Sequence, residues 1–123
     1  MVRPPTIVVC DDNQMLRWSL VWHLEQSGYR CETASNGYEL LQLLENSEPT
    51  LVLLDLEMPR MGGLEALRYL HECGPHPPVI VMTGSGDSAR SQATALGAVS
   101  TIAKPFALDD MGELVRSCLS HGA

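Results

Sequence analysis

Five polar residues follow short apolar runs of the chain and carry the functional groups of phosphoryl or metal chemistry. They are Asp11 and Asp12 after Thr6–Cys10, Asp55 after Leu51–Leu54, Thr83 after Val79–Met82, and Lys104 after Val99–Ala103. Parallel strands end at one edge of a sheet, so we expect these side chains to converge in one crevice. Three carboxylates in one crevice repel one another and resist joint ionisation. The sequence therefore predicts a site that needs a cation.

Magnesium suits such a site because it binds a few carboxylate oxygens and keeps several waters. With the metal held by Asp11, Asp12 and Asp55, a carboxylate can attack phosphorus and form an acyl phosphate. We predict Asp55 as this nucleophile, since it lies centrally, between the acidic pair and Thr83. Magnesium, the Lys104 ammonium and the Thr83 hydroxyl would each stabilise one phosphoryl oxygen.

A plainer interpretation of the acidic pair is helix capping, which is a common role of Asp and Asn. Asp12 or Asn13 could serve only as a cap, and an Asp-Asp pair alone is weak support for a metal site. The joint arrangement of suitable residues at four strand ends favours the phosphoryl and metal site.

The elements that must position these residues alternate between short apolar runs and helical patterns. Tyr29–Ala34 is a further, weaker strand candidate, as is Val99–Ala103. Helical patterns with end signals cover Gln14–Ser27, Gly37–Asn46, Leu64–Cys73, Ser88–Leu96 and Leu108–Leu119. Strands and helices that alternate in this way predict an α/β fold, a doubly wound five-stranded parallel sheet with five helices on its two faces.

Length and charge restrict the possible classes of protein. The 123 residues suffice for one domain, predicted to span 1–123, and 45% of them are hydrophobic. Eight basic against fifteen acidic residues give a formal net charge of −7, which argues against direct nucleic-acid binding. The segment Met1–Pro5 has no apolar signal region, and no apolar run reaches membrane-spanning length. We therefore expect a cytoplasmic domain without membrane contact.

The four cysteines are widely spaced, and each lies in or beside an apolar run. A zinc site would need clustered Cys and His at ligand spacing, and the sequence has no such cluster. We predict that Cys10, Cys31, Cys73 and Cys118 are reduced thiols of the core type.

Four segments resemble the receiver domains of bacterial response regulators, of which the chemotaxis receiver is the minimal example. They are Val8–Asp12, Leu53–Gly63, Val81–Gly84 and Lys104–Phe106, in the family's order and spacing over practically the whole chain. The resemblance implies a flavodoxin-like fold and a role in two-component signal transduction. It implies phosphoryl transfer to Asp55 from a phosphohistidine of a sensor histidine kinase or a phosphotransfer protein. Such a domain is not an enzyme and assists only its own phosphorylation and dephosphorylation.

The resemblance also implies roles for individual residues around the phosphoacceptor. Magnesium would be bound by Asp12, the phosphoacceptor carboxylate and the backbone carbonyl of Glu57, with Asp11 acting through water. A cis peptide before Pro105 would help to aim Lys104. The family often places a residue that contacts the attacking water at the position of Glu57. Its carboxylate is therefore expected to influence hydrolysis of the acyl phosphate.

Two tryptophans on the first predicted helix indicate a docking face. At about 100° per residue, Leu16, Leu20 and Leu24 form a buried stripe, which leaves Trp18 and Trp22 on the opposite side. Exposed aromatic side chains are typical interface anchors, although a neighbouring loop could cover these or they could be incidental. In the family this helix packs on the kinase helix bundle, so we expect it to recognise the kinase.

The resemblance places the output surface on the fourth helix, fifth strand and fifth helix. Arg17-Trp18 and Thr83–Asp87 are similar to receivers of nitrogen-regulation and nitrogen-fixation transcription regulators. Those regulators carry a DNA-binding or ATPase module after the receiver. The chain is accordingly a stand-alone receiver or a piece of a longer protein.

Thr101 departs from the family pattern. Three positions before the lysine, most receivers carry Tyr or Phe, whose ring turns inward when the threonine hydroxyl moves to the phosphoryl group. Thr101 cannot fill an aromatic-sized pocket, so coupling must rest on Thr83 and the loop 84–86. The helix over 88–96 has few large apolar residues and should be easy to displace.

Two other functions fit the same architecture. A flavodoxin-like cofactor binder would need a phosphate loop rich in Ser, Thr and Gly, whereas this chain has Asp11-Asp12 there. A receiver fold kept only for protein contacts would not need the complete set of Asp12, Asp55, Thr83 and Lys104. Both alternatives are therefore disfavoured.

Overall fold

The computed structural model describes residues 4–121 and, of His121, only the backbone. Residues 1–3 and 122–123 of the predicted domain lie outside the described residues. The first three residues of the segment Met1–Pro5, in which the sequence shows no apolar signal region, are among them. Among the described helices, none combines the length and apolar character that crossing a membrane requires.

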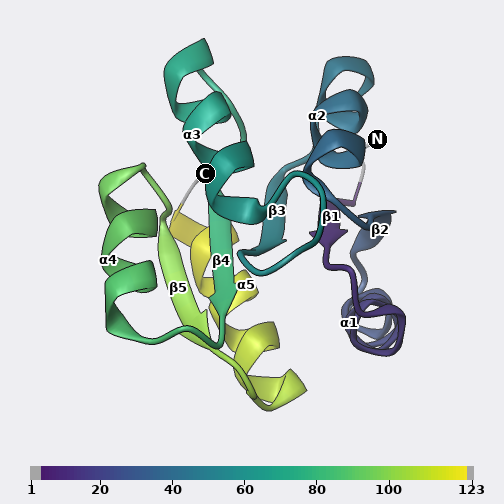
Figure 1. Ribbon diagram of the computed structural model, residues 1–123. Helices are drawn as coiled ribbons and strands as arrows, with labels where there is room; N and C mark the ends of the chain where they lie inside the picture. The colour runs from purple at the N-terminus through teal and green to yellow at the C-terminus, as the bar shows by residue number, and fades with distance from the viewer. Residues whose placement is uncertain (1–3, 122–123) are drawn as a thin grey trace.

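Five strands and five helices alternate along the chain (Figure 1). The strands are β1 (Thr6–Cys10), β2 (Arg30–Ala34), β3 (Leu51–Asp55), β4 (Val79–Thr83) and β5 (Ser100–Ala103). The helices are α1 (Gln14–Gln26), α2 (Gly37–Asn46), α3 (Gly63–Cys73), α4 (Asp87–Ala95) and α5 (Leu108–His121). The sheet is parallel throughout, in the order β2-β1-β3-β4-β5. The predicted α/β fold is confirmed, with element ends shifted by one or two residues.

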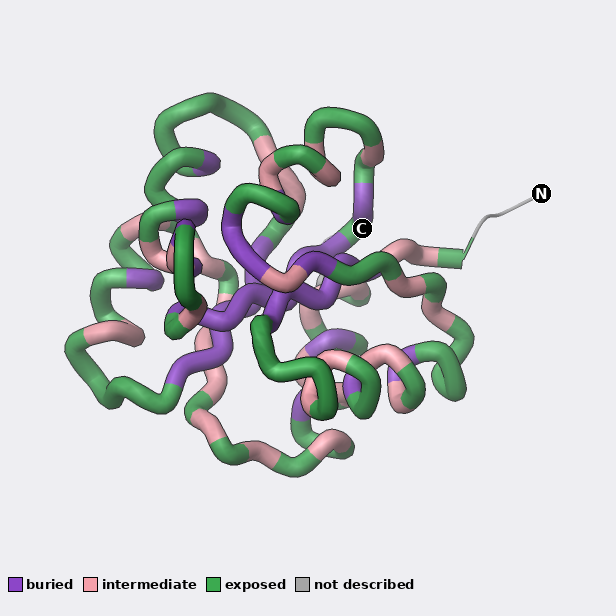
Figure 2. The backbone as a smooth tube through the Cα atoms, turned by 45° about the vertical axis from the view of Figure 1, so that its right-hand side comes forward, coloured by how far each residue is buried: buried purple, intermediate pink, exposed green. Residues whose placement is uncertain are grey.

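Alternate residues of the central strands pack into two separate cores, because successive side chains of a strand point to opposite faces. Ile7 and Val9 of β1 join buried side chains of α1 and α5. Val8 and Cys10 join those of α2, α3 and α4 on the other face. Figure 2 shows the buried strands in purple at the centre, with the helices around them. This burial on both faces explains why the central strands are continuously apolar.

The order of the strands reverses between β1 and β3, and the carboxyl ends of strands at such a reversal are the usual ligand site of doubly wound sheets. From β1 the chain turns to β2 on one side, and later returns to β3 on the other side. Asp55 and Thr83 are the last residues of their strands, whereas the apolar runs predict them just beyond the strand ends. The ladder extends this far because Asp55 pairs with Met82 and Thr83 with Ala103. Both residues still lie at the carboxyl edge of the sheet, as expected.

The loop after β3 is held close to the sheet by a glycine. A Cβ atom at Gly63 would clash with the carbonyl oxygen of Asp55. The Gly63 N–H donates to the Leu56 carbonyl at 3.1 Å, which starts α3 directly beside the strand end. Glycine is therefore required here by close backbone approach.

The prediction of core thiols is only partly right. All four cysteines are free, but only Cys10 is buried. Cys31 and Cys118 are half-buried, and Cys73 is exposed. The prediction for Cys73 is wrong because it is the last residue of α3, beyond the buried stripe that ends at Leu70.

Candidate functional site

Acidic and basic groups from three strand ends meet at the carboxyl edge of the sheet. The Lys104 ammonium lies 2.8 Å from Asp11 Oδ2 and 3.1 Å from Asp55 Oδ1. Asp11, Asp12 and Asp55 each offer a carboxylate oxygen, and these oxygens lie within 4.8 Å of one another. The structure therefore brings together the acidic residues and the lysine that the sequence indicated.

The residues of the site differ in their exposure to solvent. Asp11, Asp55 and Thr83 are buried, whereas Asp12 is exposed to solvent. Asp11 accepts a hydrogen bond from the Asn13 N–H through Oδ1, at 2.8 Å, and uses Oδ2 for Lys104. Asp12 is thus the carboxylate most accessible to an incoming cation.

Burial and charge shift the pKa of Asp55 upward. Removal from water is the largest cause and the negative charge of Asp11 adds to it, so that the pKa rises to about 7. The charge and hydrogen bond of Lys104 oppose this rise without cancelling it. In the absence of a cation, Asp55 is therefore partly protonated near neutral pH.

Lys104 remains charged in this environment. Burial pulls the pKa of Lys104 down, but the hydrogen bond to Asp11 and the charges of Asp55 and Asp11 outweigh it. The net result is a raised pKa. Lys104 thus supplies a permanent positive charge between two carboxylates at neutral pH.

The cap of α1 is Asn13, whose side chain accepts from the Leu16 N–H at 3.0 Å. The capping alternative is therefore right for Asn13 and wrong for Asp12, whose carboxylate is free of that role. Arg17 Nη1 donates to the Asp11 carbonyl at 2.7 Å, which ties α1 to the acidic loop. We did not predict this bond from the sequence.

The side chain of Glu57 has two partners on the neighbouring strand end. Thr83 Oγ1 donates to Glu57 Oε2 at 2.8 Å, and the Gly84 N–H donates to Glu57 Oε1 at 2.8 Å. The Ser85 N–H donates to Thr83 Oγ1 at 3.0 Å. From the sequence we assigned Glu57 a backbone role and an influence on hydrolysis, and missed this contact. Its signal was the adjacency of β3 and β4, whose ends place the two residues side by side.

The β4–α4 side of the site is lightly anchored. Helix α4 follows Gly86, which has a φ of 87° and provides no side-chain cap. Ala93 is its one buried residue. Arg90 Nε donates to Thr101 Oγ1 at 3.0 Å, which links α4 to β5. The expected cis peptide between Lys104 and Pro105 is present on the adjoining loop.

The predicted docking face on α1 is exposed. Trp18 and Trp22 have 58% and 64% of their surface accessible, while Leu20 and Leu24 are fully buried. Leu16, the third residue of the predicted stripe, is only half-buried. Within the part of the chain that the structure describes, the tryptophans therefore face away from the core, as expected.

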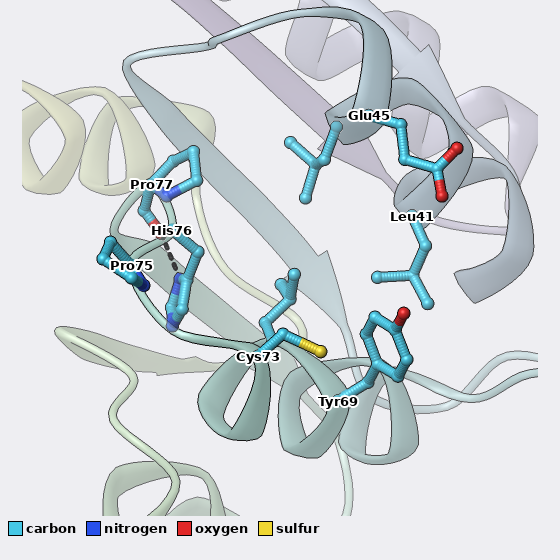
Figure 3. A pocket seen from close by; sticks show the side chains of 9 residues that line it. Leu41, Glu45, Tyr69, Cys73, Pro75, His76 and Pro77 are labelled. Carbon is cyan, nitrogen blue, oxygen red and sulfur yellow. Dashed lines mark hydrogen bonds between the residues drawn. The ribbon is translucent and has the colours of Figure 1, made fainter.

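Away from the acidic site, a hollow lies between α2, α3 and the loop before β4 (Figure 3). Tyr69 and Cys73 of α3 face Leu41 and Glu45 of α2 across it, and the loop residue His76 lies at its edge. This hollow adjoins the amino end of β4, whereas the carboxylates lie at the carboxyl edge. Its lining is mainly apolar, so it lacks the converging charges of the acidic site.

Comparison with known sequences identifies relatives over most of the chain. The model of the response regulator receiver domain family matches residues 7–116. The chain is 39% identical over 118 residues to response regulator MprA of Mycobacterium sp. strain KMS, covering 94% of this chain and 51% of that protein. It is 38% identical over 114 residues to the DNA-binding transcriptional regulator NtrC of Escherichia coli K12, covering 92% and 24%. The chain therefore spans about half of one relative and a quarter of the other.

Solved structures share the fold. A CheY-like receiver domain protein from Methanospirillum hungatei JF-1 has a TM-score of 0.91 and 29% identity, over 97% of this chain and 96% of that one. NtrX from Brucella abortus has a TM-score of 0.88 and 27% identity, over 97% and 27%. NtrC and NtrX are thus among the similar proteins, but MprA is as similar in sequence as NtrC. These comparisons do not single out the nitrogen-regulation type.

Proposed function

The chain belongs to the response regulator receiver domain family of two-component systems, and we propose that Asp55 is its phosphoacceptor in a magnesium-dependent reaction. In this proposal residues 1–123 form one receiver domain. The observation that carries it is a single ammonium, Lys104 Nζ, placed 2.8 Å from Asp11 and 3.1 Å from Asp55, both buried. A buried carboxylate beside a fixed positive charge is suited to attack an anionic phosphoryl group.

The carboxylate cluster fits magnesium. Three carboxylates against one ammonium leave the site negative, and hard oxygen ligands suit this cation. We assign direct binding to Asp12 and Asp55, together with the Glu57 backbone carbonyl. Asp11 already accepts from the Asn13 N–H and from Lys104, which supports a role through water. When bound, magnesium neutralises the carboxylates and stabilises negative charge on the phosphoryl oxygens.

In the transfer step, a carboxylate oxygen of Asp55 attacks the phosphorus of a phosphohistidine. A P–O bond forms while the P–N bond breaks, and its electron pair stays on the imidazole nitrogen. Among the described residues, the two donors to Asp55 are Lys104 Nζ and the Glu57 N–H, and both bind Oδ1. We therefore assign the attack to Oδ2. Lys104 and the Thr83 hydroxyl then stabilise separate phosphoryl oxygens.

In the return step, water attacks phosphorus, the P–O bond to Asp55 breaks, and inorganic phosphate leaves. The Glu57 carboxylate is expected to influence this rate. A receiver is a signalling domain, and we propose that it assists only these two reactions of its own aspartate. Such a domain is not an enzyme that turns over other substrates.

The proposed partners bind on two sides of the site. A sensor histidine kinase or phosphotransfer protein docks on α1, where Trp18 and Trp22 are exposed. An output domain or partner protein is recognised by α4, β5 and α5. The net charge of −7 supports signalling through protein contacts rather than direct nucleic-acid binding by this domain. The kinase partner implies a cytoplasmic location without membrane contact.

Incubation with acetyl phosphate and magnesium, followed by intact-mass measurement, tests the proposal. We expect one added phosphoryl group in the parent, none in Asp55→Ala, and none when a chelator removes the metal. Asp109→Ala is the matched control, because that aspartate is exposed on α5 and should leave labelling unchanged. Undiminished labelling of Asp55→Ala would refute Asp55 as acceptor. Asp12→Ala should bind magnesium more weakly without unfolding, and unchanged affinity would exclude Asp12 as a ligand.

A further inference from the structure

The Glu57 carboxylate holds the hydroxyl that the phosphoryl group needs. We propose that Glu57 is a positioning residue that competes with the phosphoryl group for Thr83, so that phosphorylation must displace Glu57 from the β4–α4 loop. This inference rests on the proposed phosphorylation of Asp55. It assigns the Glu57 side chain a function separate from that of its backbone carbonyl.

The competition follows from the number of protons on Thr83. A threonine hydroxyl has one proton to donate and two lone pairs that accept. The Ser85 N–H donates to this oxygen at 3.0 Å, and the hydroxyl donates its proton to Glu57 Oε2 at 2.8 Å. A phosphoryl oxygen can only accept. Thr83 can therefore bind Glu57 or the phosphoryl group, but not both with the same proton.

Both carboxylate oxygens of Glu57 accept hydrogen bonds, so displacement of Glu57 releases the Gly84 N–H as well as the Thr83 hydroxyl. Oε1 accepts from the Gly84 N–H at 2.8 Å, which fastens the first residue after β4. The Glu57 N–H meanwhile donates to Asp55 Oδ1 at 3.2 Å, which keeps its backbone beside the phosphoacceptor. A phosphoryl group on Asp55 adds negative charge next to the Glu57 carboxylate, and like charges repel. Repulsion and loss of the Thr83 proton thus act in the same direction.

Displacement of Glu57 reaches α4 through a short path. Only the loop 84–86 separates Thr83 from α4, which begins at Asp87. Gly86 adopts a φ of 87°, a conformation that glycine accepts without strain. Once Gly84 loses its carboxylate partner, this loop can follow the Thr83 hydroxyl towards the phosphoryl group. Glu57 therefore determines how much of the free energy of phosphorylation is used to displace the loop 84–86 and α4.

The affinity of the full chain for beryllofluoride, an acyl-phosphate mimic, measures this competition. Binding is titrated in the presence of magnesium and monitored by the amide resonances of Gly84 and Ser85. Glu57→Ala should bind about tenfold more tightly, which corresponds to the lower edge of the range for a hydrogen bond to a charged group. Glu57→Gln should lie between the two, because its amide keeps one acceptor oxygen. Glu65→Ala is the matched control, since Glu65 is an exposed carboxylate on α3, and its affinity should equal the parent's.

A second comparison separates the hydroxyl from simple charge. In a Thr83→Ala background, Glu57→Ala should change the affinity by less than about threefold, because the shared partner is gone. An equal tenfold gain with and without Thr83 would overturn the inference, since Glu57 would then act by charge alone. Unchanged or weaker binding by Glu57→Ala would overturn it too. If the parent neither binds beryllofluoride nor accepts phosphoryl from acetyl phosphate, the proposed function fails, and this inference with it.

Discussion

Helices α1 and α4 each follow a strand end of the candidate site, yet they are attached to the protein in different ways. Helix α1 buries Leu20 and Leu24 completely and starts with a side-chain cap from Asn13. Helix α4 buries only Ala93, and its N-cap residue, Gly86, has no side chain that could cap the helix. The difference lies in the apolar area buried and in the satisfaction of the helix ends, since both helices are short and follow a strand.

This difference separates the parts of the site that must stay fixed from those that must respond. Through Arg17, α1 holds the Asp11 carbonyl, and so fixes the loop that carries the acidic pair. Helix α4 is joined to β5 by the Arg90–Thr101 bond and to the site by a glycine-containing loop. Segments with few buried contacts open at low free-energy cost. We therefore expect metal and kinase recognition on the α1 side and the conformational response on the α4 side.

The largest effect should come from the anchors themselves. Leu24→Ala leaves a cavity in a full core and should lower the free energy of unfolding by about 3 kcal/mol. Ala93→Gly removes one methyl group from α4 and should cost only about 1 kcal/mol, mainly through helix propensity. Urea unfolding of the two variants measures both values. Equal losses would show that α4 is as firmly anchored as α1.

The carboxylates between the two helices should make stability depend on pH. The pKa of Asp55 in the folded state is raised from 3.8 to about 7. The contribution of Asp55 to the free energy of unfolding is therefore fully present below about pH 4 and is lost as the pH rises through 7. Without metal, the domain should lose roughly 2–3 kcal/mol from this group between pH 5 and pH 8. Lys104 does not interfere, because its raised pKa keeps it charged throughout this range.

Asp55→Asn isolates that contribution, since the amide does not titrate. We expect urea unfolding in the presence of a chelator to show that the free energy of unfolding of the variant increases relative to that of the parent as pH rises from 5 to 8. Magnesium added at pH 8 should restore stability to the parent and less to the variant. Parallel pH profiles for the two proteins would mean that Asp55 is ionised without metal.

Removal of a tryptophan from α1 should change recognition and leave chemistry intact. Trp18→Ala or Trp22→Ala should slow transfer from the cognate histidine kinase by about tenfold, as expected for an exposed aromatic anchor. Labelling by acetyl phosphate should continue at the parent rate. Tyr69→Ala is the matched control, because Tyr69 is also exposed, at 51%, but lies on α3. Loss with both donors would indicate a folding defect, and normal transfer would remove α1 as the docking face.

The smallest effect concerns the link between α4 and β5. With beryllofluoride, amide resonances in residues 84–97 should shift strongly and those around Thr101 only modestly, because Thr101 has no ring to reorient. Arg90→Ala removes the side-chain bond to Thr101 and should enlarge the movement of α4. Thr101→Phe should enlarge the response near β5. A shift at Thr101 in the parent as large as that in α4 would contradict this account of the coupling.

The sequence was sufficient for the fold and for the convergence of the site, because both depend on the order of strands. Buried parallel strands are read from apolar runs, and their ends must share an edge. The partners of individual side chains were not predictable in the same way. Glu57 meets Thr83 only through the pairing of β3 with β4, and its rotamer decides whether they bond. Cys73 was wrongly placed because an apolar neighbourhood in sequence does not determine which face of a helix is buried.

The chemical identity of the phosphorylated residue is the most direct test. After reaction with acetyl phosphate and magnesium, sodium borohydride reduces an acyl phosphate of aspartate to homoserine, which peptide mass spectrometry can locate. We expect homoserine at Asp55 and at no other aspartate. Homoserine at Asp11 or Asp12, or a phosphoryl group that borohydride does not remove, would contradict the assignment of Asp55 as the phosphoacceptor.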